Sequence, residues 1–154
     1  MWFIRGYSLT GVQMDVTYTP IGHVRSPHDS PADVTRENAR ETAGEIVLED
    51  AYEAGLEGLE EFSHVVVFAH LDEVEEPRLT SRPPHAEDLE VGVFATCSPH
   101  RPNPLAQTVL EVRGIEGTTL QVRGLDLLDG TPVLDLKPYV PAVDGDLEFG
   151  WLDA

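Results

Sequence analysis

The sequence predicts a mainly β protein, a small single-domain β-barrel of about seven strands with one short helix and long connecting loops. Three observations lead to this fold class. The chain has 154 residues, 41% of them hydrophobic, which suits one buried core. Short runs of β-branched and aromatic residues recur between turn signals. Long amphipathic helical patterns are almost absent, so the sheet is expected to cover its own edges by closing on itself.

Several segments have the composition of strands. Most alternate apolar with polar side chains, as strands with one buried face do. One segment, SHVVVFAHL, is continuously apolar and predicts a strand buried on both faces. Turns at Glu116-Gly117 and Asp129-Gly130 separate the last three strands. The expected strands are residues 15–25, 45–49, 63–71, 91–95, 108–115, 120–125 and 132–136.

The segments between these strands predict loops and little helix. Residues 28–44 are polar, and we expect a mobile loop with roughly one turn of helix. Residues 51–62 place apolar side chains at helical spacing, which predicts a short helix of about two turns. The acidic, proline-rich residues 72–90 predict a flap.

We expect three regions along the chain. Residues 1–13 are expected to be a disordered N-terminal extension, because they make a poor signal peptide. Residues 14–140 are the barrel domain, and residues 141–154 are an acidic C-terminal tail that straps the surface or frays. No apolar run reaches membrane-spanning length, and a single cysteine, Cys97, excludes an internal disulfide. These features predict a cytoplasmic protein without membrane contact.

The chain is strongly acidic, with 28 Asp and Glu residues, a formal net charge of −18 and Lys137 as its only lysine. Such a charge ordinarily argues against polyanion partners, because nucleic-acid affinity comes mostly from Lys and Arg. The near absence of lysine also matches adaptation to multimolar salt, where screening mutes self-repulsion. We therefore expect a halophilic protein whose charge does not exclude a nucleic-acid partner.

No metal site is expected. The six histidines lack the i, i+4 spacing of ligands on one element, and one cysteine cannot supply a paired Cys/His motif. The chain also lacks a phosphate-binding loop and a dinucleotide glycine fingerprint.

Two stiff loops, residues 97–107 and 126–132, hold most of the polar residues placed for chemistry. The prolines exclude a central strand or helix there and make rigid ligand walls. In the first loop, Arg101 and Asn103 can present donors to a carboxylate, a phosphate or a nucleobase edge. The alternative is structural: Asn103 braces the loop by bonding its own backbone, and Arg101 pairs with a surface carboxylate.

The second loop contains Asp126 and Asp129. Their carboxylates could accept ribose hydroxyls, offset a cationic ligand or act as a base. The alternative for Asp129 is a plain turn, since the DGTP sequence is a sound turn by itself.

Asp135, Lys137 and Tyr139 alternate along the last expected strand, so their side chains share a face. A chain that avoids lysine could have used arginine, which makes the placement of Lys137 suggestive of a function. The alternative is a buried ion pair between Lys137 and Asp135.

Residues 91–144 closely resemble the TrmO/TsaA-like family, also called YaeB-like. The resemblance rests on VGVFATCSPHRPNP and DLLDGTPVLDLKPYVPAVD, and the first half agrees through IGHVRSP and GLEGLEEFSHVVVFAHL. It implies a small β-barrel, commonly a homodimer, that binds S-adenosyl-L-methionine as its cofactor. It further implies a tRNA partner, methylated at N6 of threonylcarbamoyladenosine beside the anticodon.

The resemblance also implies, position by position, which residues make the site. The cofactor pocket would consist of His70, Leu71, Cys97, Arg101, Asn103, Leu105, Ala106, Gln107, Arg123, Gly124, Leu125 and Asp126. For catalysis we single out Asp126, Lys137 and Tyr139. Asp126 would offset the sulfonium charge, Arg101 and Asn103 would hold the cofactor or the modified base, and Tyr139 or Lys137 would orient the carbamoyl oxygen.

The chain departs from the family pattern at three places. Cys97 stands where the family has arginine, and Leu105-Ala106 replace Ile-Gly after RPNP. The family's Pro-Arg-Gln motif is not legible, and residues 35–37 occupy roughly its place. The C-terminal extension of bacterial relatives does not follow the barrel, which would reduce the tRNA contact surface or leave it to a dimer.

The expected function is therefore S-adenosylmethionine-dependent methylation of a tRNA, a reaction that needs alignment of the reacting atoms and removal of one proton. Two other functions remain open. The barrel could bind S-adenosylmethionine or a nucleotide as a non-catalytic sensor, or it could methylate a small molecule, which its charge mildly favours.

Overall fold

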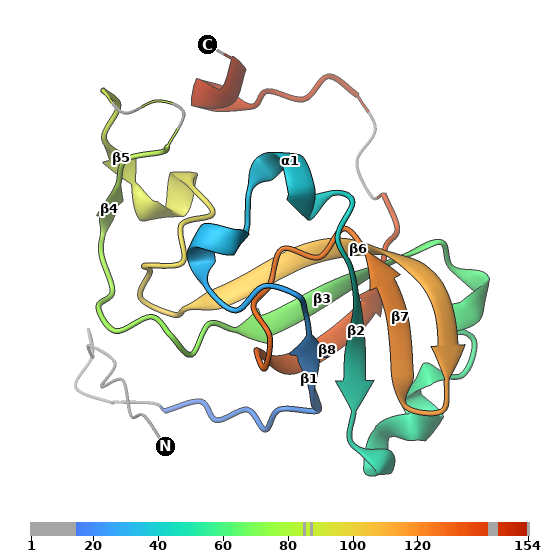
Figure 1. The fold of residues 1–154 in the computed structure, drawn as a ribbon. Coiled ribbons are helices and arrows are strands. Elements are labelled where there is room, and N and C mark those ends of the chain that lie inside the picture. Colours follow the sequence, from blue (N-terminus) through green and yellow to red (C-terminus); the bar gives the residue numbers. More distant parts are fainter. Residues whose placement is uncertain (1–14, 85, 87, 142–144, 154) are drawn as a thin grey trace.

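The computed structural model describes residues 15–84, 86, 88–141 and 145–153, and their main feature is a closed six-stranded antiparallel barrel (Figure 1). The strand order around the barrel is β1-β2-β7-β6-β3-β8, and pairing of Gly22 with Val133 closes it. The barrel strands are β1 (Gly22–Arg25), β2 (Ala43–Leu48), β3 (His64–His70), β6 (Leu105–Glu116), β7 (Thr119–Arg123) and β8 (Pro132–Pro138). The predicted fold class is thus confirmed.

One predicted strand is wrong. Only β5 (Val91–Gly92) is extended within residues 91–95, and it pairs with β4 (Thr80–Ser81) in a separate two-stranded sheet. The chain then turns into a 3-10 helix, η4 (Val93–Ala95), closed by the bond from the Thr96 amide to the Val93 carbonyl (3.1 Å). This local turn diverts the chain from the barrel, which leaves six barrel strands.

The first strand is shorter than predicted. Residues 15–20 are exposed and carry no strand, and β1 begins only at Gly22. Pro20 has no amide hydrogen to donate to a neighbouring strand, whereas the Ile21 amide already bonds the Val133 carbonyl (2.8 Å).

The prediction that β3 is buried on both faces is also wrong. Val65, Val67 and Ala69 are completely buried, but the residues between them are half-buried. A barrel has one inner face, so only alternate residues of any strand enter its core. The apolar Val66 and Phe68 therefore lie on the outside of the barrel.

The helical segments are short. Residues 28–44 contain one helical turn, as predicted, in α1 (Arg36–Ala39), preceded by η1 (Pro31–Asp33). Residues 51–62 form two 3-10 helices, η2 (Asp50–Leu56) and η3 (Leu59–Glu61), separated by Gly58 at φ 85°. A last 3-10 helix, η5 (Gly150–Asp153), ends the described chain. Among the described residues, no helix has the length and apolar character needed to cross a membrane.

A carboxylate cap holds the start of the segment between β1 and β2. The amide of Ser30 and then its hydroxyl donate to the Asp33 carboxylate (2.8 and 3.0 Å) and keep the pKa of Asp33 below its ordinary value. Since a lowered pKa favours the charged form, this cap is present at neutral pH and is lost as the pH falls through the lowered pKa.

The barrel interior is filled by aliphatic side chains. Leu110 is completely buried at the middle of this core. We expect Leu110→Ala to lower the free energy of unfolding by about 2–5 kcal/mol, because it removes buried surface and leaves a cavity. Urea denaturation checks this value, with Val16→Ala as the control at a side chain that is 66% exposed. A loss below about 1 kcal/mol for Leu110→Ala would contradict the packing.

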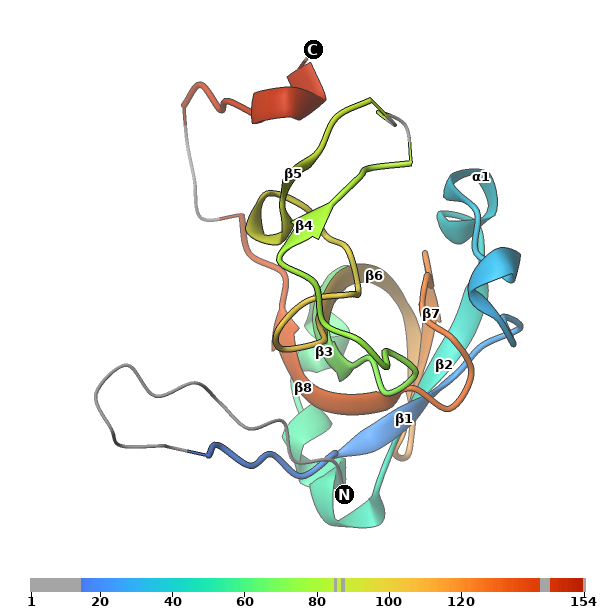
Figure 2. The same cartoon turned by 90° about the vertical axis from the view of Figure 1, so that its left-hand side faces the viewer.

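The antiparallel order brings three connecting segments to one end of the barrel. Residues 26–42 join β1 to β2, residues 71–104 join β3 to β6, and residues 124–131 join β7 to β8 (Figures 1 and 2). We call this the loop end. The opposite end holds η2, η3 and the short turn between β6 and β7.

Candidate functional site

Two groups of predicted cofactor residues meet at the loop end, at the edge shared by β3 and β6. His70 is paired with Leu105 in the sheet, and Ala69 with Ala106. The Leu71 amide donates to the Pro104 carbonyl (2.8 Å), which ties the exit of β3 to the entry of β6. Leu105 remains 48% exposed, so an apolar surface is available beside the half-buried His70 and Leu71.

Arg101 braces the first stiff loop from inside. Its Nη1 donates to the Thr96 carbonyl (2.9 Å) and to the Ser98 carbonyl (3.3 Å), and the side chain is half-buried. The predicted alternative had Arg101 paired with a surface carboxylate. In the structure, the partners of its Nη1 are instead two backbone carbonyls of its own loop. Asn103 and Cys97 are exposed on the same loop, and the Asn103 carbonyl accepts the Leu105 amide (2.7 Å).

Further predicted cofactor residues lie at the exit of β7, also at the loop end. Gly124 adopts φ 93°, and its amide and that of Leu125 both donate to the Thr42 carbonyl (2.9 and 3.2 Å). The Leu125 side chain is completely buried in the core, so Leu125 can offer a ligand only its backbone. Asp126, the next residue, is exposed. Arg123 forms an ion pair with Glu41, which links the end of β7 to the segment between β1 and β2.

Asp129 fixes a turn. Its Oδ1 accepts the Ser26 amide (2.9 Å), and its own amide donates to the His28 carbonyl (2.9 Å). Gly130 follows at φ 79°, and the Thr131 hydroxyl donates to the Leu128 carbonyl (2.8 Å). These bonds favour the structural alternative for Asp129, which holds the second loop against β1.

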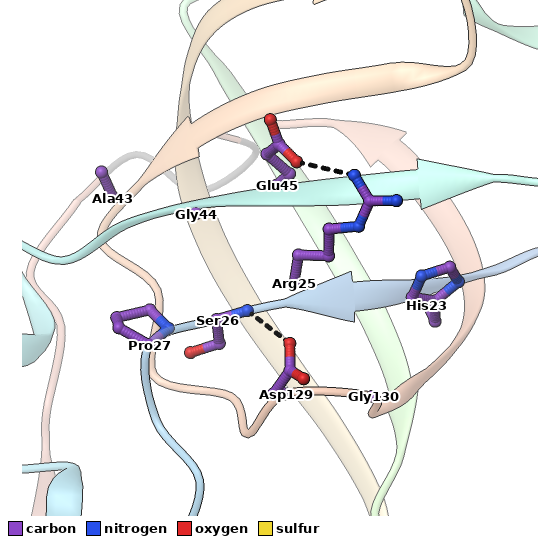
Figure 3. A pocket seen from close by; sticks show the side chains of 9 residues that line it. All are labelled: His23, Arg25, Ser26, Pro27, Ala43, Gly44, Glu45, Asp129 and Gly130. Carbon is purple, nitrogen blue, oxygen red and sulfur yellow. Dashed lines mark hydrogen bonds and ion pairs between the residues drawn. The ribbon is translucent and has the colours of Figure 1, made fainter.

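An open depression lies beside this turn on the outer surface of β1 and β2 (Figure 3). Its volume is about 500 Å³, and it contains none of the predicted cofactor residues. Arg25 is paired with Glu45 across its wall (3.2 Å), and the Asp129 carboxylate already accepts the Ser26 amide. The charged groups here therefore satisfy one another, and the predicted cofactor residues lie outside this depression. The lining residues are His23, Arg25, Ser26, Pro27, Ala43, Gly44, Glu45, Asp129 and Gly130.

Lys137 and Tyr139 lie elsewhere on the barrel. Lys137 pairs with Val66, about 13 Å along β3 from His70 at 3.3 Å per residue. The Tyr139 amide donates to the His64 carbonyl (3.1 Å), at the opposite end of the same strand, and the two rings meet edge to face at 6.4 Å. Within one chain, β3 and β6 lie between β8, which leads to Tyr139, and β7, which leads to Asp126.

The alternative of a buried ion pair for Lys137 is wrong. The Lys137 ammonium lies 3.9 Å from the Asp135 carboxylate, but the two side chains are 63% and 55% exposed. An ion pair this long and this exposed contributes little to stability. The same ammonium lies 5.6 Å from the centre of the Phe68 ring. As predicted, Asp135 and Lys137 share a face.

That face is the outside of the sheet formed by β8, β3 and β6. Residues paired in adjacent strands point to the same side, so the register places one set of side chains together there. Val109 is 40% exposed and Leu105 48%, and Phe68 and Val66 lie between them and Lys137. We call this set the outer face: His64, Val66, Phe68, His70, Leu105, Gln107, Val109, Asp135 and Lys137.

Arginines gather at the loop end despite the acidity of the chain. Arg25 and Arg123 end β1 and β7, Arg40 follows α1, and the Arg78 amide donates to the His100 carbonyl beside Arg101. No group of three or more His, Cys, Asp or Glu side chains that could hold a metal ion occurs in the part of the chain that the structure describes.

The analysis of the sequence missed one contact with this loop. The indole nitrogen of Trp151, in η5, donates to the Ala95 carbonyl (2.9 Å), two residues before Cys97. The sequence did contain a signal for this contact. A frayed acidic tail has no need of a large aromatic residue, so Trp151 indicated that the tail packs against the rest of the protein.

Comparison with known proteins identifies the family. Residues 23–145 match the model of the tRNA-methyltransferase O N-terminal domain. An S-adenosyl-L-methionine-binding protein of Archaeoglobus fulgidus is 40% identical over 126 residues, which are 81% of this chain and 90% of that protein. A tRNA (adenine(37)-N6)-methyltransferase of Mus musculus is 43% identical over 94 residues, 60% of this chain and 22% of that protein.

The crystal structure of TrmO from Pseudomonas aeruginosa has the same fold, with a TM-score of 0.75 and 36% identity. The match covers 92% of this chain but only 64% of the Pseudomonas chain. This chain thus spans nearly all of the archaeal relative and less than two thirds of the bacterial and mammalian ones. The match over residues 23–145, together with the shared barrel, shows that the chain belongs to the tRNA-methyltransferase O N-terminal domain family, the TrmO/TsaA-like family that its sequence resembles.

Proposed function

We propose that this protein is an S-adenosylmethionine-dependent methyltransferase that acts in the cytoplasm on N6 of threonylcarbamoyladenosine at position 37 of a tRNA. The observation that supports the proposal is that the antiparallel order puts the connections containing both stiff loops at the same end of the barrel. The names of the relatives support it: the archaeal relative is an S-adenosyl-L-methionine-binding protein, and the mouse relative is a tRNA (adenine(37)-N6)-methyltransferase. Residues 14–140 would carry the activity.

The loop end fits the cofactor by its chemistry. S-adenosylmethionine supplies a methyl group activated by a positive sulfur, together with an adenosine and a free amino-acid group. The exposed side chain of Leu105 and the half-buried Leu71 offer an apolar surface for an adenine ring. The exposed Asp126 carboxylate offers a negative charge near a sulfonium. Loop amides and the Asn103 side chain provide hydrogen bonds.

The residues proposed to hold the cofactor come from four parts of the chain. They are His70 and Leu71 from β3, Cys97, Arg101 and Asn103 from the first stiff loop, Leu105, Ala106 and Gln107 from β6, and Arg123, Gly124, Leu125 and Asp126 from the exit of β7. Ala106 and Leu125 point into the core, so their part is to set the backbone of the pocket wall.

The substrate would be recognised by its negative charges. The threonyl group of the modified base carries a carboxylate, which an arginine can hold with two parallel hydrogen bonds. Arg40 and Arg78 are exposed at the loop end, where they could serve this purpose or contact tRNA phosphates. The proton on N6 is acidified by the adjacent carbamoyl group, so a modest base is sufficient.

We further propose that the active unit is a homodimer. Lys137 lies on β8 and Tyr139 just after it, and β3 and β6 separate β8 from β7 and Asp126, so one chain would not complete a site with the three proposed catalytic residues. The outer face leaves Val109 and Leu105 partly exposed around these residues, which suits contact with a second copy. A two-fold axis across the strands would exchange the two ends, and it would bring Lys137 of one copy to the loop end of the other.

The function is tested with tRNA from a strain that lacks the gene. The protein is incubated with labelled S-adenosylmethionine and this tRNA in molar KCl. High salt screens the repulsion among its many acidic side chains. We expect the label to appear in one nucleoside, threonylcarbamoyladenosine with a methyl group on N6, by mass spectrometry of the digest. Cofactor binding without transfer would instead select a sensor, and label in a small molecule of an added extract would select the third function.

A further inference from the structure

We propose that Trp151 is a positioning residue for the cofactor loop: its indole N–H holds the peptide group from which the loop starts. This inference rests on the proposed function, since it assigns a role within the same site. The tail that carries Trp151 would then be a working part of the site.

The contact joins distant parts of the chain. The Trp151 Nε1 donates to the Ala95 carbonyl (2.9 Å) across 56 residues of sequence. Ala95 is the last residue of η4, and Cys97 follows two residues later. Figures 1 and 2 show η5 on the same side of the molecule as β4 and β5, where the chain returns toward the barrel.

The bond fixes a peptide plane from both sides. The carbonyl oxygen of Ala95 and the amide hydrogen of Thr96 belong to one planar group. Trp151 bonds the oxygen, and the Val93 carbonyl bonds the amide hydrogen (3.1 Å). Two bonds at opposite edges of the plane stop it from rotating, so the direction in which the chain leaves η4 is set.

The fixed peptide group leads directly to the residue that Arg101 contacts, Thr96. The Thr96 carbonyl, the next along the chain, accepts the Arg101 Nη1 (2.9 Å), and the Thr96 hydroxyl both donates to Val93 and accepts the Ser98 amide (2.9 and 3.2 Å). Trp151 thus acts through Thr96 on the loop that carries Cys97, Arg101 and Asn103. A site that binds by pre-organised loops loses affinity when such a support is removed.

The test measures cofactor affinity in two matched variants. Trp151→Phe keeps an aromatic ring and removes the donor, while Leu147→Ala changes a tail residue that is 54% exposed. By isothermal titration with S-adenosylmethionine, we expect Trp151→Phe to raise Kd about five-fold, the effect of one lost hydrogen bond. Leu147→Ala should stay within about two-fold of wild type. In turnover, we expect Trp151→Phe to raise KM for the cofactor with kcat within about two-fold.

Fluorescence gives a readout that a purely structural role would not move. In a Trp2→Phe background Trp151 is the only tryptophan, and cofactor binding should shift its emission. Unchanged Kd and KM in Trp151→Phe would overturn the inference, even if the melting temperature fell. A Trp151 emission spectrum that does not change when the cofactor is added would overturn it as well. If the wild-type protein binds no S-adenosylmethionine, the proposed function fails, and the inference fails with it.

Discussion

Replacing Arg101 with alanine is expected to lower kcat/KM for methyl transfer by about 100-fold, the scale of a misplaced reacting group. The Arg101 Nη1 holds two carbonyls of the first stiff loop, at 2.9 and 3.3 Å. Alanine leaves both carbonyls without this donor, so the loop loses the brace that sets the positions of Cys97 and Asn103. Steady-state assays with tRNA from the deletion strain measure the effect.

The matched control is Arg113→Ala. Arg113 is also an arginine paired through Nη1, to Glu111 at 2.8 Å, but it is exposed on the outer part of β6, away from the loop end. We expect it to keep activity within about two-fold of wild type. Both variants should retain the far-ultraviolet circular dichroism of the barrel, since neither side chain enters the core. Full activity in Arg101→Ala would remove Arg101 from the site.

Arg101→Lys separates bracing from ligand recognition. A lysine ammonium can reach one loop carbonyl, but it lacks the planar fork that can hold a carboxylate as well. A variant that recovers most of the loss would assign Arg101 to bracing alone. A variant as impaired as Arg101→Ala would mean that the remaining guanidinium nitrogens contact the cofactor or the modified base.

The sequence predicted the barrel because strand alternation and turn residues are local signals. β2, β7 and β8 fall close to their predicted ranges for this reason. Residues 91–95 have the composition of a strand, yet only Val91–Gly92 is extended. Val93–Ala95 folds as a 3-10 turn, because the Val93 carbonyl accepts hydrogen bonds from both the amide and the hydroxyl of Thr96. Propensity alone does not distinguish a strand from a turn that satisfies its own hydrogen bonds.

The location of candidate residues was predictable where they lie next to a strand end. His70 and Leu105 lie at or near the ends of predicted strands and pair with each other in the structure. Asp126 follows β7, whose last residue, Arg123, pairs with Glu111, six residues along β6 from Leu105. The positions of Lys137 and Tyr139 followed only in part. Their shared face was predictable from strand alternation, but how far along β3 they sit depends on the register, which Lys137 and Val66 define in the structure. Strand alternation also could not place Leu125 in the core, because Leu125 lies beyond β7, after Gly124 at φ 93°.

Mixing two inactive variants is expected to restore activity if the site is shared between two copies. Asp126→Asn removes the carboxylate at the loop end, and Lys137→Ala removes the ammonium on the outer face. Each variant alone should be nearly inactive, because every site of its dimer lacks one of the two groups. In a mixed dimer, one of the two sites receives Asp126 from one copy and Lys137 from the other, and is intact.

The expected recovery follows from counting dimers. Random exchange makes half of the dimers mixed, and each mixed dimer has one intact site, so an equimolar mixture should reach about one quarter of wild-type activity. A site built within one chain predicts no recovery at all, because no chain in the mixture carries both groups. Subunits are first exchanged under mild denaturant, and light scattering confirms the mass of the dimer before the assay.

A variant of the outer face shows whether that face forms the contact. Val109 is 40% exposed at the middle of this face and lies in the sheet beside Val66, which is itself paired with Lys137. Val109→Asp places a charge there, and a buried unpaired charge at a dimer contact costs several kcal/mol. We expect this variant to be a folded monomer that still binds S-adenosylmethionine at the loop end but does not methylate tRNA. A Val109→Asp protein that stays dimeric and active would place the dimer contact on another surface. The barrel would then have to bring Lys137 and Asp126 together within one chain, although β3 and β6 lie between β8 and β7.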